Sequence, residues 1–206
     1  MKTLYIIGNG FDIAHKLDTS YWDFRVYLAR TYPEFLQEFE HMDNIEQFDL
    51  SSPRVSAGVY KQWEKAMRKS LIGSTDYFLT FNYTDLLENV YKIKNVLHIH
   101  GGVASVTNTA PIMGHCNHKD IEDHQRLANE ADEEFDEGNA SIHRAVANYL
   151  EFTYKDTASI IRQHHECWKE LHNVDKVVIF GWSAGAADLP YLCVIRDFVS
   201  KNTKWY

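Results

Sequence analysis

The stretch Leu4-Tyr5-Ile6-Ile7-Gly8-Asn9-Gly10-Phe11-Asp12-Ile13-Ala14 carries the pattern that determines the fold class of this chain. Its four-residue apolar run stops at two closely spaced glycines, and apolar residues then recur at helical spacing. This order predicts a buried strand, a tight turn and the start of a helix. Glycines let a backbone approach a phosphate closely, and the free N–H groups at a helix N-terminus attract anions. The turn therefore predicts a phosphate-bearing ligand.

The rest of the dinucleotide fingerprint is missing. Ile13 stands where the third glycine of that motif belongs, and no clear acidic residue ends a second strand about 20 positions further on. The pattern therefore argues against an ordinary dehydrogenase.

Length and composition restrict the remaining classes. A chain of 206 residues with 45% hydrophobic residues can bury one good core. A net charge of −8 argues against nonspecific binding of nucleic acid. Three cysteines that lie far apart are typical of reduced thiols, and no apolar stretch approaches the length of a signal peptide or a membrane span. We expect a cytoplasmic protein that does not associate with membranes.

Further apolar runs that end in glycine or polar residues predict more buried strands. They are 77–81, 96–99 and 177–180, with a short additional strand at Pro111-Ile112-Met113. Such runs are typical of a parallel sheet that is covered on both sides. The predicted fold class is α/β, with a parallel Rossmann-like sheet, helices on both faces and helical insertions.

Helical patterns fill the long connections between these strands. Thr19 or Ser20 could cap a helix in which Tyr21, Phe24 and Leu28 share a face. Further apolar stripes are formed by Tyr60, Trp63, Met67 and Leu71, and by a block from about 141 to 172; we interpret all of them as core. We expect a single domain over 1–206, with core strands within about 2–18, 76–115 and 174–206. Helical insertions are expected at about 19–75 and 116–173.

Polar side chains gather where the predicted strands end. Ligands of open parallel sheets bind outside the carboxyl ends of the strands. If the strands are neighbours, these side chains share one crevice, and they are Asn9, Asp12, Asn82, Thr84, His100, Ser183 and Asp188. Purely structural roles are possible for three of them: Asn82 or Ser183 could cap a helix, and His100 could be a hydrogen-bonded histidine next to a glycine turn. Gly8 and Gly10 could likewise serve only the turn.

Several of these motifs together resemble one known family, the bacterial AbiH family of phage abortive-infection proteins. The motifs occur in order along nearly the whole chain: Ile7-Gly8-Asn9-Gly10-Phe11-Asp12-Ile13-Ala14-His15, Thr19-Ser20-Tyr21, Phe81-Asn82-Tyr83-Thr84, His98-Ile99-His100-Gly101, Gly114-His115 and Gly181-x-Ser183-x-Gly185-x-x-Asp188. The family in turn looks like a divergent branch of sirtuin-like NAD-binding domains. The resemblance implies a phage-defence protein that binds NAD or a related nucleotide.

The resemblance also implies roles for individual residues. Asn82 and His100 match the catalytic pair. The cofactor-binding set is Gly8, Asn9, Gly10, Phe11, Asp12, Thr84, Gly181, Ser183 and Asp188. Trp182 departs from the family, which commonly has histidine there, and Lys204-Trp205-Tyr206 looks like the start of a further family strand. An unfinished sheet edge would favour pairing into a homo-oligomer.

The implied chemistry is hydrolysis of the nicotinamide–ribose bond of NAD. Nicotinamide leaves as a neutral molecule, so the reaction needs a stabilised oxocarbenium-like ribose and a positioned water. A histidine can act as the general base, and an asparagine can hold the ribose without adding charge. For Asp12 we expect a contact with a ribose hydroxyl. The alternative is a non-catalytic module that senses a nucleotide or binds a partner.

Three other functions fit less well. A sirtuin-type deacetylase needs two C-x-x-C pairs for its zinc, which three scattered cysteines cannot supply. Gly181-Trp182-Ser183-Ala184-Gly185 fits the G-x-S-x-G of serine hydrolases, but every histidine precedes Ser183, against the chain order of that fold. A metal-dependent hydrolase could use His98, His100, His115, Cys116 and His118, although histidine-rich loops usually lack an ion. We expect no metal site.

Overall fold

The computed structural model describes residues 1–34, 36, 37, 61, 65, 75–103 and 107–206, and these fall into two compact units. The first unit comprises Met1–Thr109, Val174–Ser183 and Asn202–Tyr206. The second comprises Ala110–Asn173 and Ala184–Lys201.

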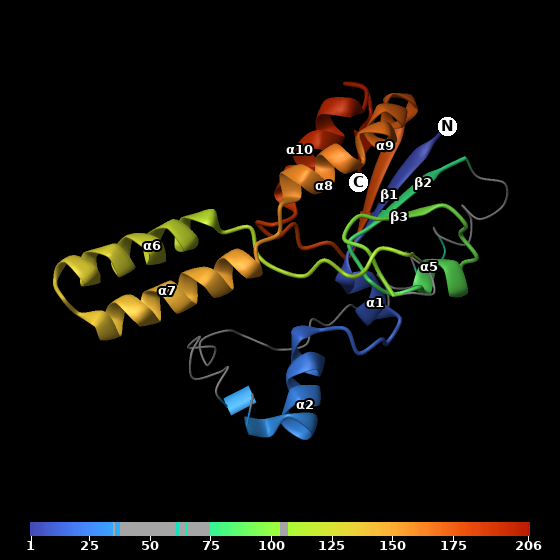
Figure 1. Cartoon of the computed structure of the whole chain (residues 1–206). Coiled ribbons are helices and arrows are strands. Elements are labelled where there is room, and N and C mark those ends of the chain that lie inside the picture. The colour runs from blue at the N-terminus through green and yellow to red at the C-terminus, as the bar shows by residue number, and fades with distance from the viewer. Residues whose placement is uncertain (35, 38–60, 62–64, 66–74, 104–106) are drawn as a thin grey trace. The chain divides into compact units, whose positions relative to one another are not determined.

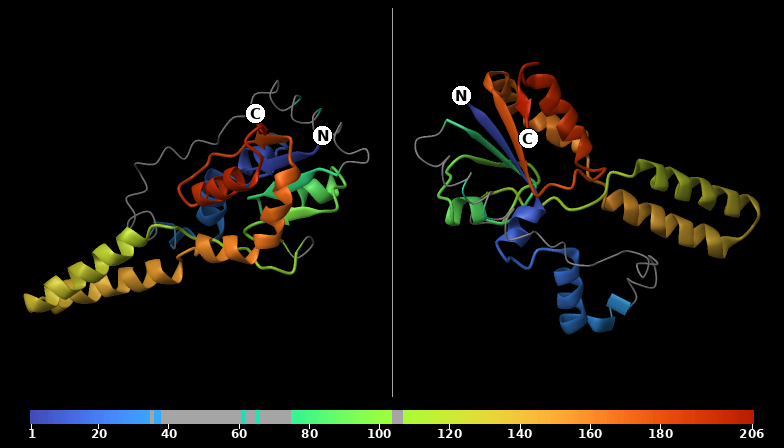
Figure 2. Two further views of the ribbon diagram at one scale, coloured as in Figure 1. Left: turned by 90° about the horizontal axis from the view of Figure 1, so that it is seen from above. Right: turned by 180° about the vertical axis from the view of Figure 1, so that it is seen from behind.

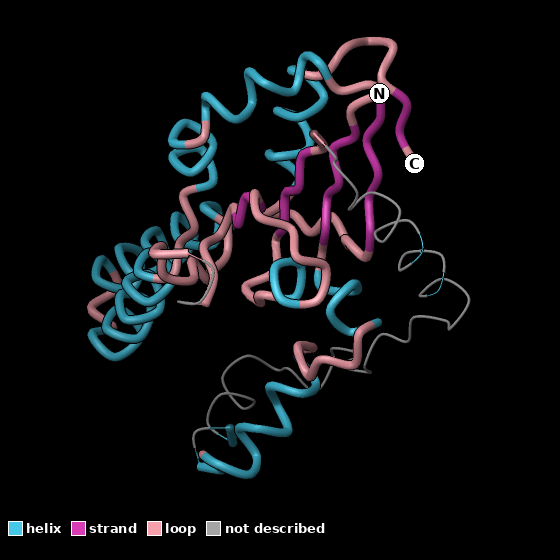
Figure 3. Tube along the Cα trace, turned by 90° about the vertical axis from the view of Figure 1, so that its right-hand side faces the viewer, coloured by secondary structure: helices cyan, strands magenta, loops and turns pink. Residues whose placement is uncertain are grey.

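The first unit contains a five-stranded parallel sheet (Figures 1 and 3). Its strands are β1 (Thr3–Ile7), β2 (Tyr77–Thr80), β3 (Val96–His98), β4 (Lys176–Phe180) and β5 (Lys204–Trp205). The strand order is β3-β2-β1-β4-β5, and every neighbouring pair is parallel. The predicted α/β fold with a parallel sheet is confirmed, and the segment 204–206 does contribute a strand.

Residues 111–113, expected as a short strand, lie outside the sheet, so that prediction is wrong. Pro111 has no backbone N–H to donate to a ladder, and Gly114 turns the chain with a φ of +142°. The nearby His115 forms only an isolated parallel bridge with Tyr154.

Both faces of the sheet are buried, as the continuous apolar strands predict. On one face, Tyr5 and Ile7 pack with neighbouring strand residues against Phe11 of α1 (Asn9–Ala14) and Leu86 and Leu87 of α5 (Leu86–Asn89). Residues of the opposite face are equally inaccessible; they are Leu4, Ile6, Leu79 and Val177.

Helix α2 (Tyr21–Thr31) begins at a capping box. The hydroxyl oxygen of Ser20 accepts from the backbone N–H of Asp23 at 3.1 Å, and the Asp23 carboxylate accepts from the Ser20 backbone. Leu28 is buried, but Phe24 is 53% exposed, so the expected core stripe is only partly buried in the described structure. The expected stripe Tyr60, Trp63, Met67 and Leu71 lies outside the described residues.

The second unit is helical. It consists of α6 (His118–Glu133), α7 (Glu137–Phe152), α8 (Thr157–Gln163), α9 (His165–Glu170), the 3₁₀ helix η2 (Leu171–Asn173) and α10 (Leu189–Phe198). Helices α6 and α7 pack side by side as a hairpin (Figure 2). Side chains of Asn117, Asp136 and Asp156 cap α6, α7 and α8. No helix within the described ranges is long and apolar enough to cross a membrane.

The turns that follow β1 and β4 are in direct backbone contact. The Gly10 N–H donates to the Gly181 carbonyl at 2.8 Å, and the Gly8 N–H donates to the Phe180 carbonyl at 2.8 Å. A Cβ on Gly8 would lie 2.5 Å from the Cα of Trp182. One on Gly181, where φ is +60°, would lie 2.6 Å from the carbonyl carbon of Gly10. These glycines are therefore required by the packing of the two turns.

We expect Gly181→Ala to lower the free energy of unfolding by about 1–3 kcal/mol, the usual cost of overpacking, because its methyl group meets the Gly10 backbone. Urea denaturation followed by circular dichroism measures the change. Gly185→Ala is the matched control, since an added Cβ there has no atom within 4 Å. Equal stability of the two variants would contradict the packing argument.

Candidate functional site

The strand order places a topological switch point between β1 and β4. From β1 the chain continues through β2 to β3 at one edge, whereas β4 and β5 extend the sheet in the opposite direction. Ligands of doubly wound α/β sheets bind outside the carboxyl ends of the strands at such a point. Here that point is formed by the two contacting turns, Gly8–Gly10 and Gly181–Ser183.

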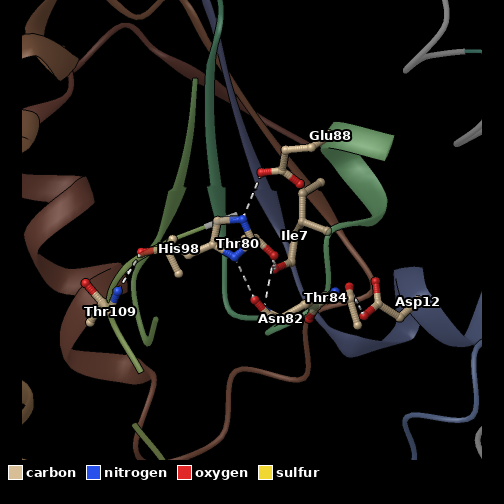
Figure 4. A network of polar contacts seen from close by, with 9 residues as sticks. Ile7, Asp12, Thr80, Asn82, Thr84, Glu88, His98 and Thr109 are labelled. Carbon is tan, nitrogen blue, oxygen red and sulfur yellow. Dashed lines mark hydrogen bonds and ion pairs between the residues drawn. The ribbon is translucent and has the colours of Figure 1, made fainter. Parts of the chain in front are cut away.

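Next to these turns, Asp12, Asn82 and Thr84 form a hydrogen-bonded group (Figure 4). The Thr84 hydroxyl donates to the Asp12 carboxylate at 2.7 Å, and the Asn82 amide also hydrogen-bonds this carboxylate. The Asn82 Nδ2 donates to the Gly8 carbonyl at 3.1 Å. The end of β2 is therefore tied to the turn after β1 by a side chain. The N-cap of α5 is Asp85, so Asn82 does not cap that helix.

Asp12 is a buried carboxyl group in this site, with only 2% of its surface exposed. Burial raises its pKa above the ordinary aspartate value, because the charged form loses its hydration. The hydrogen bonds from Thr84 and Asn82 and the charges of His15 and His98 act in the opposite direction but do not cancel this effect. Perturbed carboxyl groups of this kind concentrate at functional sites.

His98, at the end of β3, connects Asn82 to α5. Its Nδ1 lies 3.1 Å from the backbone carbonyl of Asn82, and its Nε2 lies 2.9 Å from the Glu88 carboxylate (Figure 4). A carbonyl can only accept a hydrogen bond, and so can an ionised carboxylate. The ring must therefore carry hydrogen on both nitrogens, or Glu88 must keep its proton. Either way His98 positions the backbone of Asn82.

His100 lies in a separate group of stacked rings. It is 3% exposed, and its ring meets that of Phe81 edge-on at 5.4 Å between centroids. Phe81 in turn stacks on Trp182 at 4.9 Å and 11°. Because the Trp182 backbone packs directly on Gly8, two ring contacts connect His100 with the glycine turn.

The structure thus brings most of the predicted site residues of the first unit around Gly8. Asn82 hydrogen-bonds the Gly8 carbonyl and also the Asp12 carboxylate. Thr84 joins the group through its own hydrogen bond to Asp12. Two residues of the motif point elsewhere. The Asn9 side chain donates to the Thr19 carbonyl at 2.8 Å, and the Phe11 ring belongs to the core. The Phe11 N–H is bound to the Gly8 carbonyl at 2.9 Å.

The segment 181–188, which carries the last of the predicted site residues, is divided between the two units. Ser183 is exposed at the end of the first unit, whereas Asp188 belongs to the second, as the N-cap residue of α10. Ser183 does not cap that helix. Nor does it sit on the strained elbow of a serine hydrolase, because the positive φ angles here belong to Gly181 and Ala184. The geometry therefore does not support the esterase alternative.

Asp188 acts on a buried lysine that the sequence analysis did not identify. Lys155 is 6% exposed, and burial lowers its pKa, while Asp188 and then Cys116 partly offset that effect. The loop 114–116 also contacts this segment, since the Lys155 N–H donates to the His115 carbonyl at 2.7 Å. A lone lysine between two helices in sequence gives no signal of such burial.

The residues considered for a metal-dependent hydrolase are His98 and His100 of the first unit and His115, Cys116 and His118 of the second. Among the residues that the structure describes, no three His, Cys, Asp or Glu side chains are placed to hold a metal ion. Both ring nitrogens of His98 have protein partners. The same is true of His115, whose Nε2 lies 2.9 Å from the Leu150 carbonyl and whose Nδ1 accepts from the Asn117 N–H.

Glu88 is the other site residue that sequence reasoning missed. It lies on α5, its carboxylate pairs with His98, and its second oxygen, Oε2, is buried without a hydrogen-bond partner. The only signal was its position in a short helix that follows a strand, which many surface glutamates share.

The fold and the site thus define the first unit as a doubly wound α/β unit with polar side chains at its switch point. A family model described as "Bacteriophage abortive infection AbiH" matches residues 4–53 and 43–206. The chain belongs to this family, as its motifs suggested, and membership suggests a role in abortive infection by bacteriophage. Searches of curated proteins and of solved structures found no match.

We expect Asp12→Asn to be more stable than the parent at pH 7. Because the folded-state pKa of Asp12 is raised, its contribution to stability is complete below the unfolded pKa and falls as pH rises through the folded pKa. The neutral amide avoids that loss and can still accept from Thr84. Chemical denaturation at pH 7 and pH 4 should show a gain that shrinks at the lower pH. A variant less stable than the parent at pH 7 would contradict this account.

Proposed function

We propose that the first unit binds a nucleotide of the NAD type at the switch point, and that this binding serves the abortive-infection response. The observation that supports it best is the strand order β3-β2-β1-β4-β5, with glycine turns after both central strands. This is the arrangement at which dinucleotides bind in doubly wound sheets. The polar group of Asp12, Asn82 and Thr84 lies beside the same turns.

In this proposal the phosphates lie along the glycine turns, where the missing side chains permit close approach. The N–H groups of Gly10 and Phe11 already donate to protein carbonyls, so the phosphate contacts would fall on other groups of the turns. The Ser183 hydroxyl is exposed and available for such a contact. Asp12, held by Thr84, is the acceptor for a ribose hydroxyl. Asp188 has no role in this proposal beyond the one that the family resemblance implies.

We further propose hydrolysis of the nicotinamide–ribose bond as the reaction. The bond between ribose C1′ and the nicotinamide nitrogen breaks, and its electron pair leaves with nicotinamide. A water oxygen bonds to C1′, and its proton passes to the His100 ring, which acts as general base. Asn82 orients the ribose through its amide. The ring contacts of His100 with Phe81 would fix the orientation of the imidazole.

Binding without turnover is the second candidate function, and one observation favours it. Asn82 and His100 are 7% and 3% exposed, and the Asn82 amide is already bound to Gly8 and Asp12. A sensor needs only the glycine turns and the polar group, whereas a hydrolase needs both side chains to reach a ligand. Either function fits a defence protein that responds to the nucleotide pool.

Binding is tested by calorimetry with NAD and with ADP-ribose. Thr84→Val removes the hydroxyl that orients Asp12, and we expect it to weaken NAD binding about tenfold, the cost of one well-placed hydrogen bond. Thr31→Val, an exposed threonine on α2, is the control and should bind like the parent. No heat of binding with either nucleotide would contradict the proposed ligand class.

Turnover is tested by the release of nicotinamide from NAD. We expect His100→Ala and Asn82→Ala to lower the rate at least about 100-fold, the usual contribution of a general base. His172→Ala, an exposed histidine, should leave the rate unchanged. Circular dichroism must show that each variant is folded. Binding without any nicotinamide release would favour the sensor, and unchanged release in both variants would remove these residues from the mechanism.

A further inference from the structure

Helix α7 carries two apolar stripes, of which only one is used within the described structure. The inner stripe, Ala140, His143, Ala147 and Leu150, lies toward α6, and its alanines are buried. The outer stripe consists of Ile142, Ala145, Tyr149 and Phe152. With 3.6 residues per turn, the two stripes lie on opposite sides of the helix.

The outer stripe is strongly exposed. Ile142 is 60% exposed, Tyr149 59% and Phe152 90%, and Ala145 is also exposed. Its spacing of three, four and three residues is that of the a and d positions of a coiled coil. The outward positions of α6 differ completely, because they carry polar or charged residues: Glu122, Gln125, Arg126, Asn129 and Glu133. The hairpin therefore has one polar and one apolar outer side.

We propose that the outer stripe of α7 pairs with α7 of a second copy of this chain, in antiparallel orientation about a twofold axis near residue 147. In this register Ile142 faces Phe152 of the second copy, and Ala145 faces its Tyr149. The small alanine lies opposite the large tyrosine, so the surface is complementary to itself. Such self-complementarity is what a twofold symmetric interface requires.

The charges along the stripe also suit a second copy. The positions that flank the seam in a coiled coil are Ser141, Val146, Asn148 and Thr153, all uncharged. Two copies of a chain with a net charge of −8 repel each other at long range. Close pairing along α7 nevertheless brings no like charges together at these positions. Arg144, near the inner side, is already paired with Asp132 of α6.

The area approaches the lower limit for a specific dimer. Two aromatic side chains from each copy, at the exposures given above, supply on the order of 600 Å² of buried surface. Ile142, Ala145 and Val146 from both copies bring the total toward the roughly 1,000 Å² expected of a specific interface.

Analytical ultracentrifugation of the whole chain tests this pairing. We expect the parent to be a dimer at micromolar concentration, and Tyr149→Ser or Phe152→Ser to raise the dimer dissociation constant at least about tenfold. Phe24→Ser removes an aromatic residue of α2 in the first unit that is 53% exposed, close to the 59% of Tyr149; it is the matched control and should leave the dimer intact. A parent that is monomeric throughout, or a dimer that tolerates both α7 variants, would overturn the proposal.

The register is tested by disulfide cross-linking after replacing Cys116, Cys167 and Cys193 by serine. A mixture of Ala145→Cys and Tyr149→Cys chains should form the 145–149 heterodimer at least about tenfold more efficiently than Ala145→Cys alone, which keeps Tyr149 in both copies, forms a homodimer. Cross-linking of Ala145→Cys alone as efficient as that of the mixture would indicate parallel pairing and overturn the antiparallel arrangement. This test does not depend on nucleotide binding.

Discussion

The contact between the two glycine turns is the constraint on which the first unit depends. Backbone atoms of Gly8 and Gly10 lie against those of Gly181 and Trp182 so closely that no side chain fits between them. Because the turns end β1 and β4, their contact is compatible only with these strands as central neighbours in the sheet. The switch point of the strand order follows from that adjacency, and the pairing of β1 with β2 brings Asn82 to the same turn.

The apolar runs of the sequence were sufficient for four of the five described strands and for their parallel direction. Apolar runs at 4–7, 77–80 and 177–180 are unambiguous because a parallel strand buried on both faces has no polar alternation. The strand prediction at Pro111-Ile112-Met113 was wrong because a run of three apolar residues does not show whether strand pairing is possible. Here the missing N–H of Pro111 and the positive φ of Gly114 prevent it. The glycine motif also allowed two interpretations, since the absence of a side chain suits a phosphate and a neighbouring backbone equally well. The structure supports the second role directly and leaves the first as a proposal.

The partners of the polar residues could not be derived from the sequence, because they depend on strand order and on contacts over long sequence separations. Asn82 binds the carbonyl of Gly8, 74 positions away, and His98 binds the carbonyl of Asn82. Neither hydrogen-bond partner can be recognised from a pattern in the sequence. The same holds for Asp12: its place in the motif was clear, but the burial that raises its pKa depends on residues around 82–84. A carboxyl group kept in so costly a position is typical of sites where function outweighs stability.

The apolar residues assigned to the core in the block from about 141 to 172 include Trp168 and Leu171, which are buried, and Val146 and Leu150 of α7, which are only partly buried. That assignment did not include the exposed outer side of α7. Hydrophobic periodicity identifies a face that avoids water; it does not identify what covers that face. Here α7 has two such faces and α6 can occupy only one. All residues proposed to contact the nucleotide through observed site geometry lie in the first unit, and the whole proposed pairing surface lies in the second. The two functions are therefore separable by mutation, and any influence of one on the other would require a coupling free energy between the units, reciprocal by thermodynamic necessity.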